Sequence, residues 1–458
     1  MEFLSNVLSL FGVFLGLSVV VTIHEAGHFL AARWAGVEVE AFAIGWGKVL
    51  WSWKRGVTEF RICLLPLGGY CKMKGEQDLS AAFESQAQTI TASPGSLFAS
   101  PSWKRIVISA AGPLTNLILA FVLFFALSQT GLSQAGGPAR IQLSNELGTG
   151  ADLPAVKAGL VTGDKVTAVD GSPIVTFSQL RSRIEQSSGH PLSLTVDRNG
   201  TKIDIRVAAS EDPASGRFIL GIVELIDPVI SQVGTRSAAA LAGFLPGDRI
   251  VSVEGQPMVS QASFARSIQG EGIRKVAVQV ERKGQTVNLF LVLERGVEAG
   301  IQFSAPFLVP TAPSPLEAAA EGYKATVKLL SAMVVGLGRV LTGQLNPMDN
   351  LSGPIGILQA GTEITNQAYS AGLLQGLDAS VSFLAVISLA LFLMNLLPIP
   401  ALDGGNIIVS AIEGIRRRRL GLKALVRYQQ VGVALILGLV LLTTFIDLPK
   451  LFRAVFPG

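Results

Sequence analysis

One stretch near the start of the chain decides the fold and the chemistry: VVVTIHEAGHFLAA at residues 19–32. Positions i and i+4 of a helix share one face, so His24 and His28 can bind one metal ion together. Glu25 then lies beside the metal, where its carboxylate can take a proton from metal-bound water. The chain has only three histidines, and two of them are here. The stretch therefore predicts a zinc site on a helix.

The flanking residues predict that this helix spans a membrane. The sequence is almost uninterruptedly apolar from Val7 to Ile23, and the helical pattern continues to Ala32. Glu2 is the only early charge, so the positive region of a signal peptide is missing and we expect a retained span. Hydrophobic residues make up 49% of the chain and charged residues 15%, whereas a soluble protein has about 25% charged residues. Ionisable groups in a bilayer are costly and are functional by default.

Three further apolar stretches predict three more spans, so we expect a polytopic α-helical membrane protein with four transmembrane helices. The segment between the second and third spans contains an internal repeat, in which AGLVTGDKVTAVDG (158–171) matches AGFLPGDRIVSVEG (242–255). Its Gly-Asp pattern looks like that of PDZ domains, which capture peptides by strand addition. We expect two β-rich PDZ-like domains that either bind peptides or serve as a spacer or size filter.

Residues 37–75 alternate between apolar and polar positions and predict β-hairpin structure of unusual apolarity. Such a hairpin is either a small cytoplasmic sheet or a re-entrant β-loop that dips into the membrane beside the metal. Cys63 and Cys71 are the only cysteines. Their spacing is not that of a zinc knuckle, so we interpret them as ordinary thiols rather than a metal pair or a disulfide. Residues 76–102 predict a flexible loop.

The third candidate ligand is Asp403, which ends the stretch NLLPIPALDGG at residues 395–405. The prolines should open the third span and free backbone groups that need polar partners. A carboxylate completes many catalytic zinc sites that contain two histidines. The alternative for Asp403 is a helix N-cap at the membrane surface. In the second span, Gly112-Pro113 and Asn116 predict close packing or a hydrogen bond, with a structural role and a catalytic role both open.

The charges predict a topology that the metal site must satisfy. Residues 33–105 contain nine Lys and Arg, and residues 416–427 contain six. Both loops belong in the cytoplasm by the positive-inside rule, which places the two repeats and both termini on the outer side of the membrane. His24, His28 and Asp403 then lie near the same cytoplasmic face, so they can meet.

Together these motifs resemble the site-2 protease family over essentially the whole chain. The resemblance rests on His24-Glu25-x-x-His28, the GPxxN motif at residues 112–116, the paired repeats and the N-x-x-P-x-P-x-L-D-G motif at residues 395–404. It implies an intramembrane zinc metalloendopeptidase that binds one Zn²⁺ per chain through His24, His28 and Asp403, with Glu25 as general base. The remaining expected site residues are those that contact the substrate or its oxyanion, namely Asn395, Pro398, Pro400, Gly68, Gly69 and Tyr70.

The resemblance also implies partners and a location. The substrates would be single-span membrane proteins, such as an anti-sigma factor in regulated intramembrane proteolysis, and remnant signal peptides. The location would be the bacterial inner membrane. The stretch AIGWG at residues 43–47 departs from the Gly-Phe-Gly-Pro form of many members, which puts individual contacts of that loop in doubt. We expect no nucleic-acid partner, because no basic groove is interleaved with aromatic residues.

Two alternatives stay open: a non-catalytic membrane PDZ scaffold, and a membrane-anchored zincin that acts on soluble substrates. The predicted organisation is as follows: residues 1–34 form the first span, 35–105 the cytoplasmic and re-entrant β region with its loop, 106–128 the second span, 129–225 and 226–305 the two PDZ-like domains, 306–380 a linker with interfacial helices, 381–404 the third span, 405–430 a basic cytoplasmic loop, and 431–458 the fourth span and C-terminus.

Overall fold

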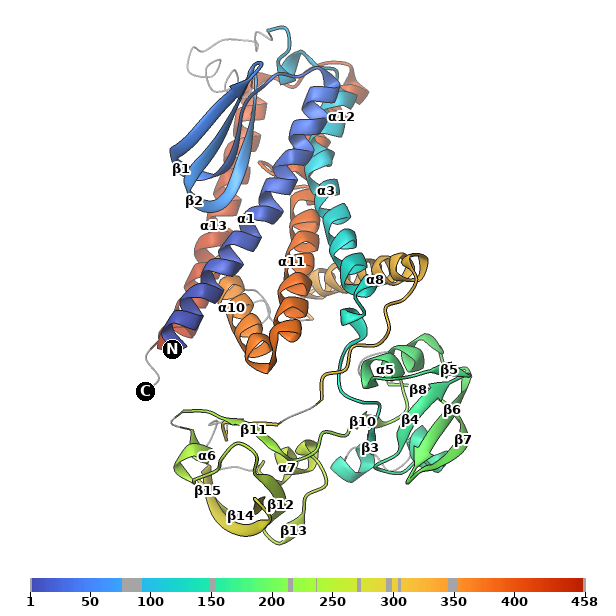
Figure 1. Cartoon of the computed structure of the whole chain (residues 1–458). Helices are drawn as coiled ribbons and strands as arrows, with labels where there is room; N and C mark the ends of the chain where they lie inside the picture. The colour runs from blue at the N-terminus through green and yellow to red at the C-terminus, as the bar shows by residue number, and fades with distance from the viewer. Residues whose placement is uncertain are drawn as a thin grey trace. The chain divides into compact units, whose positions relative to one another are not determined.

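The computed structural model describes residues 2–75, 93–148, 153–212, 217–235, 237–269, 273–293, 299–303, 306–344 and 353–455. These residues form two compact units, described separately below (Figure 1). The first unit joins residues 1–133 to residues 313–458, and the second consists of residues 134–312. Most of the predicted loop at 76–102 lies outside the described residues.

The first unit is a helical bundle with one β-sheet. Its helices are α1 (Glu2–Ala35), η1 (Leu97–Ala99), α3 (Ser102–Gln129), η2 (Leu132–Gln134), α8 (Pro315–Leu341), α10 (Pro354–Ala371), α11 (Leu373–Leu396), α12 (Asp403–Arg416) and α13 (Leu422–Val455). Within the described residues, four helices are long and apolar enough to cross a membrane, over Leu10–Ala35, Ser102–Gln129, Leu373–Leu396 and Lys423–Phe445. This agrees with the predicted class of a four-span membrane protein with β-rich parts.

The third span differs from its predicted bounds of residues 381–404. Helix α11 begins earlier, at Leu373, and ends at Leu396. The predicted opening of the helix is confirmed, because proline restricts the residue before it and removes a backbone donor. Asp403 is therefore not on the spanning helix but is the first residue of α12.

The predicted basic loop at residues 405–430 is wrong for most of its length. Helix α12 continues to Arg416 and α13 begins at Leu422, so only residues 417–421 connect them. Lys and Arg are good helix formers, and a run of them does not by itself indicate a loop. Arg417 ends α12 in the left-handed conformation, with φ 52°.

The predicted linker at residues 306–380 contains a helix, α10, that begins shortly after residues 345–352. Residues 350–352 lie outside the described residues, and α10 begins at Pro354. Proline is common in the first turn of a helix because its missing N–H would have no partner there. The proline therefore marks a helix start here.

Helices α1 and α3 pack side by side in the bundle (Figure 1). A Cβ on Gly27 would lie 2.5 Å from the carbonyl oxygen of Ala111, so the two backbones approach closely only because glycine is there. The hydroxyl of Thr115 donates to the carbonyl of Ile23 at 3.2 Å. Small residues and interhelical hydrogen bonds drive such association in membranes. This contact turns the histidine-bearing face of α1 towards α3.

Strands β1 (Val39–Arg55) and β2 (Thr58–Met73) form an antiparallel sheet in which each long strand bends. Residues 41–44 pair with residues 59–62 on one side and with residues 69–72 on the other. Residues 59–62 pair in turn with residues 51–54. Two bent strands therefore give four segments side by side, and residues 69–72 form one edge. The predicted β-structure is confirmed.

The outer part of this sheet is apolar but exposed. Its exposed large apolar side chains are Ile44, Trp46, Val49, Leu50, Trp51, Trp53, Val57, Leu64 and Leu65. Cys63 and Cys71 are both free and buried in β2. A sheet with this surface needs an apolar environment around it.

The second unit is built from the repeat. Its elements are β3 (Ile141–Leu143), η3 (Ser144–Leu147), α4 (Pro154–Lys157), β4 (Lys165–Val169), β5 (Ser172–Pro173), α5 (Phe177–Gln186), β6 (Pro191–Arg198), β7 (Thr201–Ala208), β8 (Ser210–Glu211), β9 (Phe218–Ile219), β10 (Ile222–Glu224), β11 (Ile230–Val233), α6 (Ala238–Leu241), β12 (Arg249–Val253), β13 (Gln256–Pro257), α7 (Gln261–Ser267), β14 (Arg274–Arg282), β15 (Gln285–Leu293) and β16 (Ile301–Phe303). The sheets β5-β4-β6-β7 and β13-β12-β14-β15 have the same order. The sequence repeat is thus a structural repeat with two separate apolar cores.

Each repeat contains the same ion pair. Arg198 donates to both carboxylate oxygens of Asp164 at 2.8 Å, and Arg282 does the same to Asp248 at 2.7 Å. The aspartates are fully buried. Each arginine also donates to the carbonyl of a glycine, Gly159 or Gly243, in the repeat motif. In the first repeat the ion pair therefore ties the loop before β4 to the end of β6. In the second repeat it ties the loop before β12 to the end of β14.

A buried polar contact joins the two repeats. The hydroxyl of Ser260 donates to Oε1 of Gln142 at 2.6 Å, and the amide of Gln142 donates to the hydroxyl of Ser263 at 3.0 Å. Gln142 and Ser260 are fully buried. A satisfied buried polar network fixes one arrangement, because any slip would leave its groups unpaired.

The repeat ion pair gives a test of stability. We expect Asp248→Asn to destabilise the second repeat by about 1–3 kcal/mol, because one charge-assisted pair is lost from a buried site. Although burial alone raises the pKa of Asp248, hydrogen bonds from Arg282 and the Leu245 amide hold it below its ordinary value. The pair therefore stabilises the fold above the unfolded pKa and loses this effect as pH falls through the folded pKa.

Hydrogen–deuterium exchange of β12 and β14 in the full chain measures this effect. Protection should fall in Asp248→Asn, and the further loss on acidification should be smaller than in the unsubstituted chain. Glu281→Gln, at an exposed position of β14, is the control and should leave exchange unchanged. Equal protection in both variants would contradict a stabilising role of the pair.

Candidate active site

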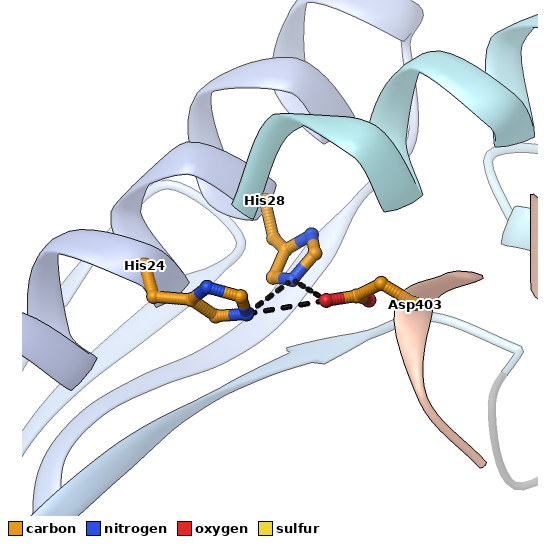
Figure 2. Close-up of side chains that lie close together, drawn as sticks. All are labelled: His24, His28 and Asp403. Carbon is orange, nitrogen blue, oxygen red and sulfur yellow. Dashed lines mark hydrogen bonds and ion pairs between the residues drawn. The ribbon is translucent and has the colours of Figure 1, made fainter. Parts of the chain in front are cut away.

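Three side chains converge where α1 meets the start of α12 (Figure 2). His24 and His28 project from one face of α1, and their Nε2 atoms lie 3.2 Å apart. Oδ2 of Asp403 lies 3.2 Å from Nε2 of His24 and 3.4 Å from Nε2 of His28. Both histidines are buried, with 7% of their surface exposed. The structure therefore brings together the three residues predicted as ligands.

The geometry of these three atoms fits a tetrahedral zinc ion. Ligand atoms about 2.0–2.1 Å from zinc in a tetrahedron lie about 3.3–3.4 Å from one another. The three observed separations, 3.2, 3.2 and 3.4 Å, are close to that edge length. Two imidazoles and a carboxylate are also a donor set that zinc prefers, and the set leaves a fourth position open.

A hydrogen bond sets which nitrogen of His28 is available. Its Nδ1 lies 2.8 Å from the carbonyl oxygen of Ile108 on α3. A carbonyl can only accept, so Nδ1 carries the proton and Nε2 keeps its lone pair for a metal. The tautomer of His28 is thus fixed by the backbone of the second span.

Asn116 contacts Nδ1 of His24, as the carbonyl of Ile108 contacts Nδ1 of His28. Its side-chain amide nitrogen lies 3.2 Å from Nδ1 of His24, while its Oδ1 is buried without a hydrogen-bonding partner. The two ends of an amide are nearly isosteric, and exchanging them lets Oδ1 accept from Nδ1–H. That orientation satisfies the orphaned oxygen and frees Nε2 of His24 for a metal. The sequence left the role of Asn116 open, because only its partner identifies it.

Gly112 permits the close approach of α3 to the two histidines. A Cβ at this position would lie 2.3 Å from Nε2 of His28 and 2.8 Å from Nε2 of His24. Any larger residue would therefore fill the place where the ligand atoms meet. The hydroxyl of Ser388 on α11 donates to the backbone carbonyl of Asn116 at 2.7 Å and ties a third helix to this point.

Glu25 lies beside the cluster without belonging to it. It is half-buried, and its charged neighbours are His28, His24 and Asp403. The backbone of Cys71 on β2 forms a hydrogen bond with its carboxylate. An acceptor so close to a metal position can take a proton from water there.

The turn before α12 presents Asp403 to the histidines. A Cβ on Gly404 would lie 2.2 Å from the carbonyl oxygen of Leu397, and one on Gly405 2.3 Å from that of Ile399, so the chain folds tightly back here. Leu402 is the N-cap of α12. The alternative that Asp403 is an N-cap is therefore wrong, because its carboxylate faces the two imidazoles instead.

The other predicted site residues lie in three places. Asn395 is in the last turn of α11, and Pro398 and Pro400 are in the segment that leads to Asp403. The remaining three, Gly68, Gly69 and Tyr70, are in β2. The carbonyl of Gly68 accepts from the hydroxyl of Ser18 on α1 at 3.4 Å, which places this strand along the helix with the histidines. None of these six belongs to the described ligand cluster.

A His-x-x-x-His helix that meets a carboxylate inside a bundle of spanning helices defines the class of membrane metallohydrolases. The model of peptidase family M50 matches residues 12–439 of this chain. The chain belongs to peptidase family M50, the site-2 proteases, and is a zinc metalloendopeptidase of the membrane.

Individual relatives match the chain along nearly its whole length. A protein of Treponema pallidum (strain Nichols), whose assigned name is that of a zinc metalloprotease, is 31% identical over 441 residues, covering 95% of this chain and 98% of that protein. The regulator of sigma-E protease RseP of Escherichia coli (strain K12) is 32% identical over 461 residues, covering 95% of this chain and 97% of that protein.

The contact at Gly112 gives a direct test of the site. We expect Gly112→Ala to lower the zinc content of the purified protein to well below one ion per chain, because the methyl group would occupy the place where the imidazoles meet. Metal analysis by mass spectrometry measures this. Gly12→Ala is a matched control on α1, where a Cβ would meet nothing within 4 Å. Equal zinc content in the two variants would contradict the geometry.

Proposed function

We propose that this protein hydrolyses a peptide bond within or beside the transmembrane segment of single-span membrane proteins, using Zn²⁺ bound by His24, His28 and Asp403. The observation that carries the proposal is the convergence of these three ligand atoms, contributed by α1 and α12, among helices long and apolar enough to span a membrane. A site for soluble substrates would have no reason to lie there, since polar groups among spanning helices are costly.

The roles of the remaining groups follow from their positions. A bound zinc ion supplies Lewis acidity, which acidifies water and polarises a carbonyl. Glu25 holds the proton taken from water and passes it to the leaving amine. The carbonyl of Ile108 and the side chain of Asn116 keep the imidazoles oriented through their Nδ1 atoms.

The sheet supplies a way to hold an extended substrate. A peptide bond in a helix is hidden in hydrogen bonds, so the substrate must unwind and its freed backbone groups need partners. The edge segment at residues 69–72 runs beside α1 and offers such partners by strand addition. In this proposal Gly68, Gly69 and Tyr70 form the re-entrant β-loop that positions the substrate.

The turn between α11 and α12 completes the proposed substrate path. Asn395 would hold the substrate or the oxyanion, and Pro398 and Pro400 would line the path towards Asp403. Proline frees backbone groups of the segment, and these groups can bind an extended chain.

The charges support the predicted orientation in the bacterial inner membrane. Lys104 donates to the carbonyl of Ala35 at 2.8 Å, which brings the basic start of α3 to the end of α1 that carries the histidines. Arg416–Arg419 at the end of α12 extend this basic surface, which belongs in the cytoplasm. The two repeats, as PDZ-like domains, and both termini would then be periplasmic.

The substrate class follows from the relatives. Relatives that match nearly the whole chain, such as the Escherichia coli protein, carry the name "regulator of sigma-E protease". We therefore propose an anti-sigma factor as one substrate. Remnant signal peptides are a second substrate of the same single-span form. The PDZ-like repeats would bind peptides or exclude substrates that still carry a folded periplasmic domain.

The two alternative functions are less well supported. A non-catalytic scaffold has no use for three ligand atoms spaced as zinc requires. A zincin that acts on soluble substrates commonly takes its third ligand from a soluble helical domain, whereas here it comes from α12, directly after a candidate span.

The role of Glu25 is tested by Glu25→Gln. We expect zinc content to stay near one ion per chain while cleavage of a reconstituted, tagged single-span substrate falls about 10²–10⁴-fold, because the proton acceptor is lost. Product fragments mapped by mass spectrometry give the rate and the cleavage position. Glu40→Gln on β1, in an exposed ion pair with Lys72, should keep full activity. Undiminished cleavage by Glu25→Gln would remove Glu25 from the mechanism.

The orientation of Asn116 is tested by a pair of substitutions. Asn116→Leu should weaken zinc binding about 10–100-fold, because His24 loses the acceptor that orients it. Asn116→Asp should retain most of the affinity, since a carboxylate can only accept and would still face Nδ1–H. Competition with a chelator measures both affinities. The reverse order would mean that the asparagine donates to His24, and would contradict the orientation proposed here.

A further inference from the structure

The end of the first unit where α3 begins and α12 ends contains a cavity of about 610 Å³. Ser102 and Gly414 both line it, and the two helices approach closely there, because a Cβ on Gly414 would lie 3.4 Å from the Cβ of Ser102. Three successive arginines line its mouth, namely Arg417, Arg418 and Arg419. The proposed catalytic and substrate-binding residues are not among those that line it.

The positive charge of this cavity is not balanced by its one acidic residue. Glu413 is buried, and Oε2 accepts from Arg105 at 2.6 Å while Oε1 accepts from the backbone N–H of Leu420 at 2.8 Å. Both of its oxygens are therefore engaged inside the protein. Within the described residues, none of Arg417, Arg418 and Arg419 forms an ion pair, although Arg419 donates to the carbonyl of Phe98.

Arg105 and the N-terminus of α3 add positive charge at the same cavity. Arg105, of which only 7% is exposed, lines it, and its Nε–H is buried without a hydrogen-bonding partner. The first turn of α3 contains no acidic residue, and Pro101 provides no side-chain cap. The N-terminus of this 28-residue helix therefore adds its partial positive charge to that of the arginines. An anion with several acceptor oxygens can accept from the arginine side chains that line this cavity and from the first turn of α3.

Tryptophans place the cavity at the membrane surface. Trp103 lines it and is 55% exposed, and its ring meets that of Trp34, which is 66% exposed, at a centroid distance of 6.0 Å. Exposed tryptophans at the ends of spanning helices lie at the level of the lipid headgroups. Phosphate groups of the bilayer are found at this level, and basic pockets between spanning helices bind them.

We propose that this pocket binds a phosphate group, carried by the headgroup of an anionic phospholipid or by a small soluble phosphate. The phosphate oxygens would accept from the arginines at the mouth and from the first turn of α3. The ligand thereby joins α3, which contacts both imidazoles, to α12, which begins with Asp403. The site does not depend on the proposed proteolysis.

Binding is measured by titrating delipidated full-length protein in detergent with three probes: dihexanoyl phosphatidylglycerol, dihexanoyl phosphatidylcholine and inorganic phosphate. The pocket variant is Arg417→Gln/Arg418→Gln/Arg419→Gln. The matched control, Arg416→Gln/Lys423→Gln/Arg427→Gln, removes the same charge from the same stretch but outside the lining. We expect phosphatidylglycerol to bind saturably, and the pocket variant to weaken it at least about tenfold, with less than a threefold effect in the control.

Ser102→Asp is a second variant that separates binding from folding. A carboxylate in the first turn stabilises a helix, and it can still accept from Arg105, as the serine hydroxyl does at 3.2 Å. It places a negative charge on the floor of the cavity, so it should abolish phosphate binding without lowering the melting temperature.

The probes also distinguish the source of the phosphate. Binding of phosphatidylglycerol but not of inorganic phosphate identifies a lipid, whereas tight binding of inorganic phosphate identifies a soluble ligand. Either result supports the site if the pocket variant and Ser102→Asp lose it. Equal binding by the pocket and control variants, or no saturable binding of either anion, would overturn the proposal.

Discussion

The structure depends on one constraint: the polar atoms of a metal site must all be satisfied among apolar helices. Unpaired polar groups are costly where water is scarce, so each imidazole needs a partner for both of its nitrogens. The partners on the Nδ1 side come from α3, as the carbonyl of Ile108 and the amide of Asn116. That leaves both Nε2 atoms aimed at one point. The close packing of α1 on α3, which Gly27 and Gly112 make possible, is therefore a condition for the chemistry as well as for the fold.

The same constraint explains why the third carboxylate arrives on a separate short helix. If α11 continued as one helix to Asp403, the backbone groups before Asp403 would be hydrogen-bonded within that helix, and the chain could not turn there to direct the carboxylate at the histidines. Breaking the helix between Leu396 and Asp403 lets the carboxylate face the two imidazoles. Gly404 and Gly405 permit this tight fold, because a Cβ at either position would lie within 2.3 Å of a backbone carbonyl oxygen.

Much of this was predictable from local sequence, because its signals are local. The helical spacing of His24 and His28, the charge asymmetry of the loops and the Pro-rich approach to Asp403 were enough to place the three ligand atoms together. The role of Asn116 was not predictable, since it depends on which helix faces it. The bounds of α12 were not predictable, because Lys and Arg are compatible with a helix as well as with a loop. The buried pair of Arg105 and Glu413, which joins α3 to α12, is visible only in the folded chain. Likewise, the sequence shows Asp164 and Asp248 only as equivalent residues of the repeat. Their ion pairs with Arg198 and Arg282 are seen only in the folded chain.

The separation of the converging residues along the chain also has a consequence for biosynthesis. His24 and His28 are synthesised before the second unit, and Asp403 only after it. A nascent chain thus has two of the three groups for most of its synthesis, and two imidazoles alone bind a metal ion weakly. With the ligand set proposed above, the zinc site can be completed only after the second unit and the third span have been synthesised.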